Sequence, residues 1–427
     1  MSPSDIARGI RPYLATFVSF NAIQASQILS PLLALPLLAR VLGPEAYGLV
    51  MYMTVISVTV GQIMDWGFVT GATREAAVCR ERPDAQARLL ESVLSAKFIL
   101  AAFCVLLSIV SLPILPHAAE HPGAYTLSVL WGICRGLNPT WFFQGLGHGI
   151  RRIALWDVCS SGLVLLLTFI FVRETADWPR YPFFLVLCKG ATYAHFTAGL
   201  VRQCHVVVEF RVGGEALLRN AILFAGTLST FLYSHGAQLV LGFFLIPEQM
   251  GILVTADKIA RGFVWLGNPV FQTLFPEVCA GRFSGRERAM RLVCSTLVGV
   301  TAAMLCVCAF VNFTAPWICS LFLGQAYEEA VSVLRVMICF IPIIACNMVL
   351  GTQALVAFGH EKTLVVVQTL VGIPSLPVAA LLGYKWGLIG GSWFTLLAES
   401  AVLLGLIAGT LRLCPGIFFR KTSTEAQ

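Results

Sequence analysis

Long apolar runs, rather than alternating apolar and polar positions, dominate the hydrophobic pattern of this chain of 427 residues. A helix needs about 20 apolar residues to cross the hydrocarbon core of a bilayer, so these runs predict membrane-spanning helices. A membrane barrel would show short alternating segments instead. The chain is predicted to cross the membrane about twelve times, near residues 13–39, 48–71, 94–115, 123–146, 153–172, 181–202, 220–245, 249–273, 292–316, 331–357, 363–383 and 387–411.

The composition agrees with a membrane protein and excludes a soluble globule. The chain is 57% hydrophobic and only 12% charged, whereas soluble domains carry about 25% charged residues. Much of its surface must therefore face lipid, where helices and closed barrels satisfy the backbone internally. The 14 cysteines are scattered through apolar runs and are expected to act as small hydrophobic residues. The run from Pro12 to Ala39 is too long for a cleavable signal and is expected to be a retained helix.

The distribution of basic residues predicts the orientation. With the N-terminus inside, 20 of the 29 Lys and Arg residues fall in cytoplasmic segments or at their span edges, and four fall on the opposite side. This bias predicts that both termini are cytoplasmic. The longest loops, near 72–93, 203–219 and 274–291, are basic and too short to form domains. Their charge suits the phospholipid bilayer, and no nucleic acid is expected as a partner.

A repeated turn divides the chain into two halves. Leu42–Gly48 and Leu245–Gly251 lie 203 residues apart and share Pro-Glu-x-x-Gly, a turn that starts a helix with proline and an acid. Parallel repeats with an even number of spans are a transporter architecture. We therefore expect an N-terminal six-helix lobe over 1–210 and a C-terminal six-helix lobe over 211–427, which together form one transmembrane transporter domain.

Ionisable residues inside the predicted spans mark candidate functional positions. Each costs about 2.5–3.5 kcal/mol near the bilayer centre on insertion scales, so such residues are rarely retained without a role. The chain carries Asp65, Arg135, Lys189, Asp257, Lys258, Arg261 and Glu399. Basic residues outnumber acids in this set, which mildly favours an anionic substrate.

The eighth span carries the clearest polar stripe. Asp257, Asn268, Arg261 and Gln272 fall within about 60° on a helical wheel, with Lys258 beside them. Such a stripe must face a watery cavity or other helices. Asp257 and Arg261 are four residues apart and could form an internal ion pair. The charge of Lys258 would then have to be balanced by another group, and a phosphate or pyrophosphate would suit.

Uncharged polar residues leave two interpretations open. Asn21 and Gln24 in the first span and Gln238 in the seventh can hydrogen-bond to neighbouring helices as readily as to a substrate. At the 203-residue offset, Asp65 aligns with Asn268. The polar faces of both halves could therefore look into one central cleft.

Several segments resemble a known transporter family. They are Arg40–Gly48, Thr73–Glu75, Trp141–Gln144, Asp257–Arg261, Asn268–Pro269 and Gln272–Pro276. They are similar to the Wzx-type polysaccharide flippases of the multidrug/oligosaccharidyl-lipid/polysaccharide (MOP) exporter superfamily. The resemblance implies an all-α integral membrane fold of two six-helix lobes around a central cleft that is often cationic.

The resemblance also implies a substrate and its site. The substrate would be an undecaprenyl-pyrophosphate-linked oligosaccharide, moved across the bacterial inner membrane for O-antigen, capsule or exopolysaccharide synthesis by alternating access. Polysaccharide polymerase and chain-length machinery are implied partners, and no cofactor or metal is expected. Lys258 and Arg261 would be cleft cations, with Asp65 and Asn268 nearby. The other expected substrate-binding residues are Asp257, Gln272, Arg135, Asn21, Gln24 and Gln238.

Other functions remain open at this point. A drug/cation antiporter of the same superfamily would be expected to carry mainly acidic residues in its cleft. A membrane polysaccharide polymerase or ligase would need an acceptor site, commonly on a large outer loop, and every predicted outer loop is short. A generic sugar or drug permease has a similar number of spans. The expected chemistry is transport without catalysis.

Overall fold

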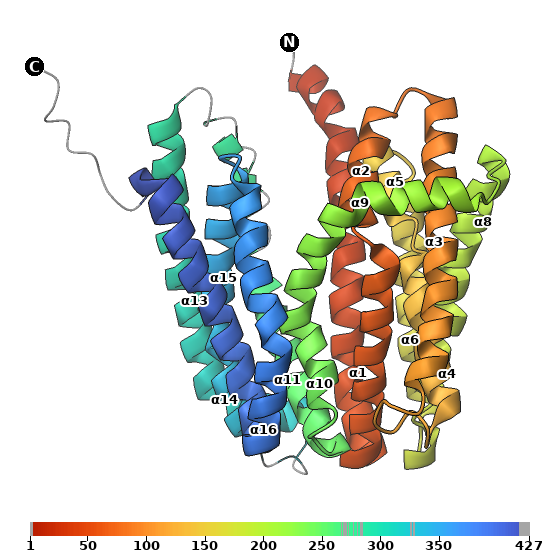
Figure 1. The fold of residues 1–427 in the computed structure, drawn as a ribbon, viewed down its shortest axis with the longest axis vertical. Helices are drawn as coiled ribbons and strands as arrows, with labels where there is room; N and C mark the ends of the chain where they lie inside the picture. Colours follow the sequence, from red (N-terminus) through yellow and green to blue (C-terminus); the bar gives the residue numbers. More distant parts are fainter. Residues whose placement is uncertain are drawn as a thin grey trace, which may run out of the picture. The chain divides into compact units, whose positions relative to one another are not determined.

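The computed structural model describes residues 3–265, 267, 271, 273–275, 277–279, 281, 285–324, 327 and 329–417, with side chains at position 19 and from 21 onward. Within these ranges every regular element is a helix (Figure 1). The chain divides into two compact units, Met1–Leu228 and Ser229–Gln427. In this described part of the chain, eight helical stretches are long and apolar enough to cross a membrane. The predicted all-α membrane class is therefore confirmed.

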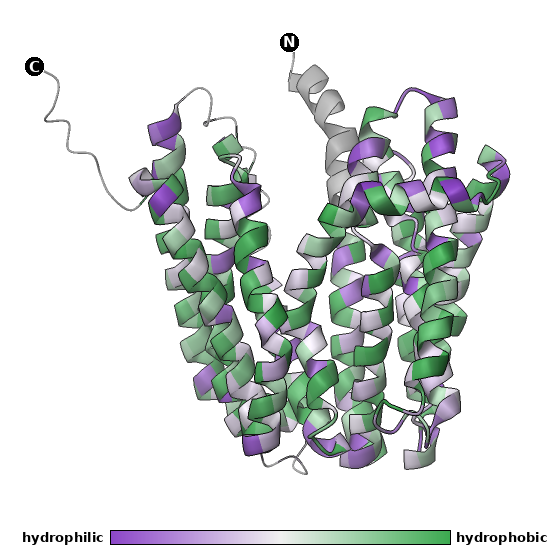
Figure 2. Cartoon of the chain, viewed as in Figure 1, coloured by the Kyte–Doolittle hydropathy of each residue, from purple (hydrophilic) through white to green (hydrophobic). Residues whose placement is uncertain are grey.

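The hydropathy of the surface explains why lipid must surround these helices. Figure 2 shows hydrophobic residues along the middle of most helices and hydrophilic residues mainly toward the helix ends. Large apolar side chains are strongly exposed, as for Phe313 (87%) and Leu404 (68%). A soluble protein does not expose contiguous apolar surface on this scale.

The first unit is built around a long, interrupted helix. Its α1 contains two helices joined at Gly43, whose φ of 72° lies in the left-handed region. Pro44 follows directly, as the repeated turn predicts. The helices of this unit are α1 (Pro3–Asp65), α2 (Phe68–Val78), α3 (Pro83–Ser111), α4 (Pro122–Gly136), α5 (Thr140–Leu146), α6 (Ile150–Phe171), η1 (Thr175–Asp177), α7 (Arg180–Phe184), η2 (Leu185–Gly190), α8 (Ala191–Cys204) and the first part of α9 (Phe210–Phe231).

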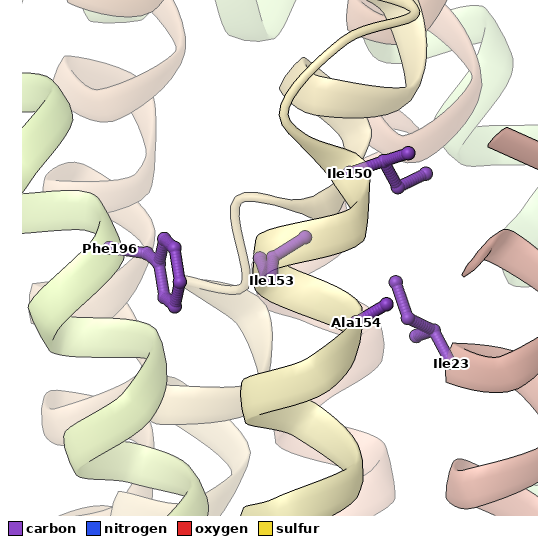
Figure 3. Close-up of a cluster of buried hydrophobic side chains, with 5 residues drawn as sticks. All are labelled: Ile23, Ile150, Ile153, Ala154 and Phe196. Atoms are coloured by element: carbon purple, nitrogen blue, oxygen red, sulfur yellow. The ribbon is translucent and has the colours of Figure 1, made fainter. Parts of the chain in front are cut away.

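Apolar packing holds α1 against its neighbours in the first unit. α1 packs mainly against α4 and α6. In Figure 3, α6 contributes Ile150, Ile153 and Ala154, with Ile23 of α1 on one side and Phe196 of α8 on the other. All five side chains are buried.

Two predicted spans are longer than the helices that the structure forms. The second was expected to continue to residue 71, but α1 ends at Asp65 because Trp66 and Gly67 adopt positive φ angles of 46° and 78°. The fourth was expected to reach residue 146, but α4 ends at Gly136. Pro139, just before α5, cannot donate a helical hydrogen bond and disfavours helix at the residue before it.

The second unit contains the rest of α9 and a second interrupted helix. Its later elements are η3 (Leu232–Gly236), α10 (Ala237–Leu241), α11 (Pro247–Trp265), α13 (Arg286–Phe322), α14 (Ala330–Ile338), α15 (Phe340–Met348), η4 (Val349–Val356), α16 (Glu361–Leu413) and η5 (Pro415–Ile417). α16 contains two helices joined at Gly387, whose φ is 53°. α11 packs against α14, α15 and α16, so this charged helix is surrounded by protein on most sides.

Candidate functional site

Arg261 of α11 is the centre of a polar network in the second unit. Its Nε donates to both carboxylate oxygens of Asp257, at 2.9 and 3.1 Å. One terminal nitrogen lies 3.9 Å from Glu399 of α16, and the guanidinium carbon lies 5.5 Å from the centre of the Phe340 ring. Asp257 and Glu399 are 2% and 5% exposed. The internal ion pair that the spacing allowed is therefore formed.

The Asp257 carboxylate orients the Arg261 guanidinium but uses only some of its N–H donors. An arginine presents five N–H donors in a fixed fork. Among the described residues, the hydrogen bonds of Asp257 come from Nε, and the Arg261 side chain remains 31% exposed. Its terminal nitrogens therefore retain donors for a further anion.

Asn347 of α15 holds the second acid of this network. Its Nδ2 donates to Glu399 Oε2 at 3.0 Å and to the Glu399 backbone oxygen at 3.1 Å. The network therefore joins α11, α15 and α16. The amide oxygen of Asn347 is buried and has no hydrogen-bond partner among the described residues.

The partly exposed face of α11 is centred on Lys258 rather than on Asp257. In the second half of α11, Lys258, Arg261, Gly262, Phe263 and Trp265 are partly exposed. All but Phe263 lie three, four or seven residues from Lys258 and therefore on one face. Asp257 is buried beside this face. The predicted polar stripe is therefore rotated, and Lys258 belongs to its accessible part. Lys258 also interacts with other groups of the protein.

A second set of charges lies where α1, α3 and α4 meet in the first unit. Asp65, the last residue of α1, accepts a hydrogen bond from the Val69 backbone at 3.0 Å. The Lys97 ammonium, from α3, is 2% exposed and donates to the Gly136 carbonyl at the end of α4. Arg135 of α4 passes close to α1, because a Cβ at Gly61 would lie 3.4 Å from its Cδ. Arg135 is exposed.

A third set of charges in the first unit is fully internal. Asp157 of α6 lies 3.3 Å from the Lys189 ammonium and accepts hydrogen bonds from Tyr193 at 2.7 Å and Ser26 at 2.5 Å. Asp157 and Lys189 are 1% and 5% exposed. This pair satisfies its own charges and joins α1, α6, η2 and α8.

The uncharged residues that were predicted to bind substrate are buried or partly buried where the structure describes them. Asn21 and Gln24 are partly buried on α1. Gln238 is buried on α10, where its Oε1 lies 3.3 Å from His235 Nδ1. Asn268 and Gln272 lie outside the described residues. The structure thus brings together Asp257 with Arg261 in the second unit. Asp65 and Arg135 lie on the neighbouring helices α1 and α4 of the first unit, with no ion pair between them among the described residues.

Sequence reasoning missed two charged residues of these networks. Asp157 was not singled out, and Lys97 was counted among the basic residues at a cytoplasmic span edge. Both lie inside predicted spans, at 153–172 and 94–115, and an ionisable residue in a span was the available signal. Lys97 lies about four turns into α3 because this helix begins early, at Pro83.

The described part of the chain offers no metal site. Among these residues there is no group of three or more His, Cys, Asp and Glu side chains that could hold a metal ion. Two of the clusters contain ion pairs, Asp257 with Arg261 and Asp157 with Lys189. Ionisable residues inside membrane helices typically pair in this way or mark the path of a substrate.

Solved structures with the same fold are membrane transporters. The chain matches the inward-facing conformation of a multidrug resistance MATE family transporter of the MOP superfamily at a TM-score of 0.70, with 15% identity, over 94% of this chain and 98% of that chain. It matches the lipid II flippase MurJ in an inward closed conformation at 0.69, with 15% identity, over 94% and 87%. The chain therefore has the fold of these transporters, and its described part carries eight candidate membrane spans.

The sequence comparisons identify the family within this class. The family model described as "Polysaccharide biosynthesis protein" matches residues 16–279. An Escherichia coli (strain K12) protein named "Putative O-antigen transporter" is 24% identical over 404 residues, which cover 90% of this chain and 93% of that protein. The chain belongs to the polysaccharide biosynthesis protein family, which confirms the resemblance to polysaccharide transporters.

Proposed function

We propose that the protein is a flippase that carries undecaprenyl-pyrophosphate-linked oligosaccharides from the cytoplasmic to the periplasmic leaflet of the bacterial inner membrane. The transported units would serve O-antigen, capsule or exopolysaccharide synthesis. Family membership and the E. coli relative support this substrate class. The observation that carries the proposal is the partly exposed face of α11, where Lys258 and an oriented Arg261 present positive charge on a helix that is proposed to cross the membrane.

The headgroup chemistry fits this face. A pyrophosphate is the part of the substrate least soluble in lipid, and Arg binds phosphate oxygens through paired, charge-assisted hydrogen bonds. Asp257 holds Nε, so the terminal nitrogens of Arg261 remain as donors. We assign Lys258, Arg261 and Arg135 to the pyrophosphate. Asp257 orients Arg261, and the sugar is assigned to the uncharged and acidic side chains Asp65, Asn21, Gln24, Gln238, Asn268 and Gln272.

The proposed topology has twelve crossings in two six-helix lobes, 1–210 and 211–427, with both termini in the cytoplasm. α1 and α16 have 63 and 53 residues, or about 95 and 80 Å at 1.5 Å per residue, and each contains two helices. A single crossing needs about 30 Å. Counting each of these two helices as two crossings raises the eight candidate spans to ten. α4 and α11, which are shorter or more charged, supply the other two of the twelve crossings.

The proposed mechanism is alternating access without covalent chemistry. The polar residues bind the sugar and pyrophosphate from the cytoplasmic side while the polyprenyl chain stays in lipid. A conformational change then opens the same residues to the periplasm. Polysaccharide polymerase and chain-length machinery are proposed to receive the product.

The charges around α11 distinguish this proposal from a drug/cation antiporter. Asp257 and Glu399 are buried, and both face Arg261. A cationic drug would have to displace an arginine to reach either acid. An anion approaching the exposed side of Arg261 meets no such competitor among these groups.

Polymer export from cells tests the proposal. In a strain that lacks the chromosomal gene, Arg261→Ala and Lys258→Ala are each expected to abolish surface polymer while membrane protein levels hold. Arg335→Ala is the matched control because Arg335 is an exposed arginine on α14 of the same unit. Normal export by both α11 variants would reject the assigned site.

A further inference from the structure

A groove along α16, on the surface of the second unit, plays no part in the proposed transport step. Its volume of about 370 Å³ is within the range of cavities that hold small molecules. Both helices of α16, before and after Gly387, contribute to its lining, which is apolar and aromatic throughout: Leu382, Trp386, Ile389, Gly390, Trp393 and Leu397. A ligand that fills the groove must therefore be apolar along its length.

Gly390 allows the two helices of α16 to meet at this groove. A Cβ there would lie 2.1 Å from the Leu382 carbonyl oxygen and 3.1 Å from Trp386 Cβ. Gly390, Trp393 and Leu397 follow one another at spacings of three and four residues, so they lie on one face of the second helix. Trp386 and Trp393 remain 62% and 48% exposed. The indole rings are therefore open to whatever surrounds the unit.

The groove has the depth of one lipid leaflet in the proposed topology. There α16 crosses the membrane twice and turns at Gly387, so this turn lies at the outer surface. Leu397 is ten residues further along, or about 15 Å at 1.5 Å per residue. This distance is half of the hydrocarbon thickness of about 30 Å. The groove therefore runs from the interface, where tryptophan is enriched, to the middle of the bilayer.

Lys385 places a positive charge at the interfacial end of the groove. It is the only charged residue between Lys362 and Glu399. Lys385 is exposed and forms no ion pair among the described residues. Lys385 and Trp386 follow Leu382 by three and four residues, so the three share one helix face. A ligand with an apolar chain in the groove and an anionic end beside Lys385 matches this arrangement.

We propose that the groove binds one acyl chain of an anionic phospholipid of the outer leaflet, with the headgroup phosphate beside Lys385. An acyl chain gains little by leaving other lipid tails for the groove, since these tails are just as apolar. Selectivity must therefore come from charge, and one lysine near an anionic lipid headgroup gives a preference of about fivefold. The site does not depend on which substrate the protein transports.

Quenching of tryptophan fluorescence by brominated lipids tests this site, because bromine quenches only the tryptophans that it contacts. The full-length protein is reconstituted in phosphatidylethanolamine vesicles that contain dibrominated phosphatidylglycerol or dibrominated phosphatidylethanolamine. The variant Trp386→Phe/Trp393→Phe identifies the share of the quenching that arises in the groove. Half of this share is expected to be quenched at about a fivefold lower mole fraction of the anionic lipid.

Two lysine variants separate the headgroup contact from general contact with lipid. Lys385→Gln is expected to remove the preference and to leave quenching by the zwitterionic lipid unchanged. Lys362→Gln is the matched control and should keep the preference, because Lys362 is an exposed lysine near the other end of α16. Equal quenching by both lipids in the unsubstituted protein, or a preference that survives Lys385→Gln, would overturn the site.

A competition experiment checks the assigned occupant against the polyprenyl chain of a transported substrate. Unbrominated phosphatidylglycerol is expected to displace the brominated lipid from the groove at least as readily as a polyprenyl phosphate does. If the polyprenyl phosphate displaces it more readily, the groove holds a polyprenyl chain and the assigned phospholipid is wrong. The flippase proposal stands in either case, since it rests on α11.

Discussion

At the residue scale, the proposed site depends on how Asp257 and Glu399 contact Arg261. Asp257 accepts a hydrogen bond of 2.9 Å from the Nε of Arg261, whereas Glu399 lies 3.9 Å from a terminal nitrogen of the same guanidinium. The first contact is a charge-assisted hydrogen bond and fixes the direction of the side chain. The second is beyond hydrogen-bonding distance and mainly balances charge. Asp257 and Glu399 are therefore expected to contribute unequally to the orientation of Arg261.

Replacing each acid by its amide measures this difference. Asp257→Asn keeps the side-chain shape but removes the charge that orients Arg261, and is expected to reduce polymer export by about tenfold or more. Glu399→Gln is expected to have a smaller effect because its contact with Arg261 is longer. Export is compared at equal protein level. A larger loss from Glu399→Gln than from Asp257→Asn would contradict this geometry.

The Asp157–Lys189 pair gives a prediction about stability rather than transport. Removing one member of a buried pair leaves an uncompensated charge and typically costs about 3–5 kcal/mol. Asp157→Leu is therefore expected to lower the melting temperature of the purified protein strongly. The double variant Asp157→Leu/Lys189→Met is expected to recover most of the loss. Equal melting of the single and double variants would show that Lys189 does not depend on Asp157.

At the element scale, close approach of α1 and α4 positions the charges of the first unit. A Cβ at Gly132 would lie 2.6 Å from Val60 Cβ and 2.7 Å from the Ser57 carbonyl, and one at Gly136 would lie 2.1 Å from Met64 Cβ. Two glycines four residues apart on one helix allow this approach, as in many membrane helix pairs. In the second unit, Gly383 allows a similar close approach between helices, because a Cβ there would lie 2.8 Å from the Leu241 side chain.

A bulky residue in this contact tests its importance. Gly132→Leu is expected to force α1 and α4 apart and to reduce the amount of folded protein in the membrane, because the neighbouring atoms include backbone. Gly162→Leu is the matched control, since Gly162 lies on α6 with no atom within 4 Å of the added Cβ. Similar folded yields for the two variants, judged by size-exclusion profiles in detergent, would argue against this contact.

The same elements show what the sequence could and could not predict. Apolar runs were sufficient for the all-α membrane class, and the spacing of Asp257 and Arg261 allowed their ion pair. The rotation of the α11 face toward Lys258 depends on which neighbours cover the helix, and a helical wheel does not contain that information. The contact of Lys97 with Gly136 joins residues 39 positions apart, so only tertiary packing reveals it. The helix ends at Asp65 and Gly136 were missed because left-handed turns and Pro139 interrupt apolar runs.

At the scale of the whole molecule, the proposed orientation in the membrane rests on the distribution of basic residues among the loops. A cysteine at position 84, before the apolar part of α3, is expected to react with an impermeant thiol reagent only after the cytoplasmic side is opened. A cysteine at position 120, beyond α3, is expected to react in intact spheroplasts. Asp84 and Glu120 are both exposed, so Asp84→Cys and Glu120→Cys in a background without native cysteines suit the test. The reverse labelling pattern would invert the proposed topology.

Transport in a reconstituted membrane is the decisive test of the proposed flippase. Proteoliposomes contain the purified protein and a fluorescent oligosaccharide on a polyprenyl pyrophosphate, and a glycosidase added outside cleaves only the outer leaflet's substrate. We expect the protected inner pool to become cleavable at a rate that depends on the protein, and Arg261→Ala to return this rate to that of empty liposomes. If the inner pool stays protected with the unsubstituted protein, or becomes cleavable equally fast with Arg261→Ala, the protein is not a flippase that uses Arg261.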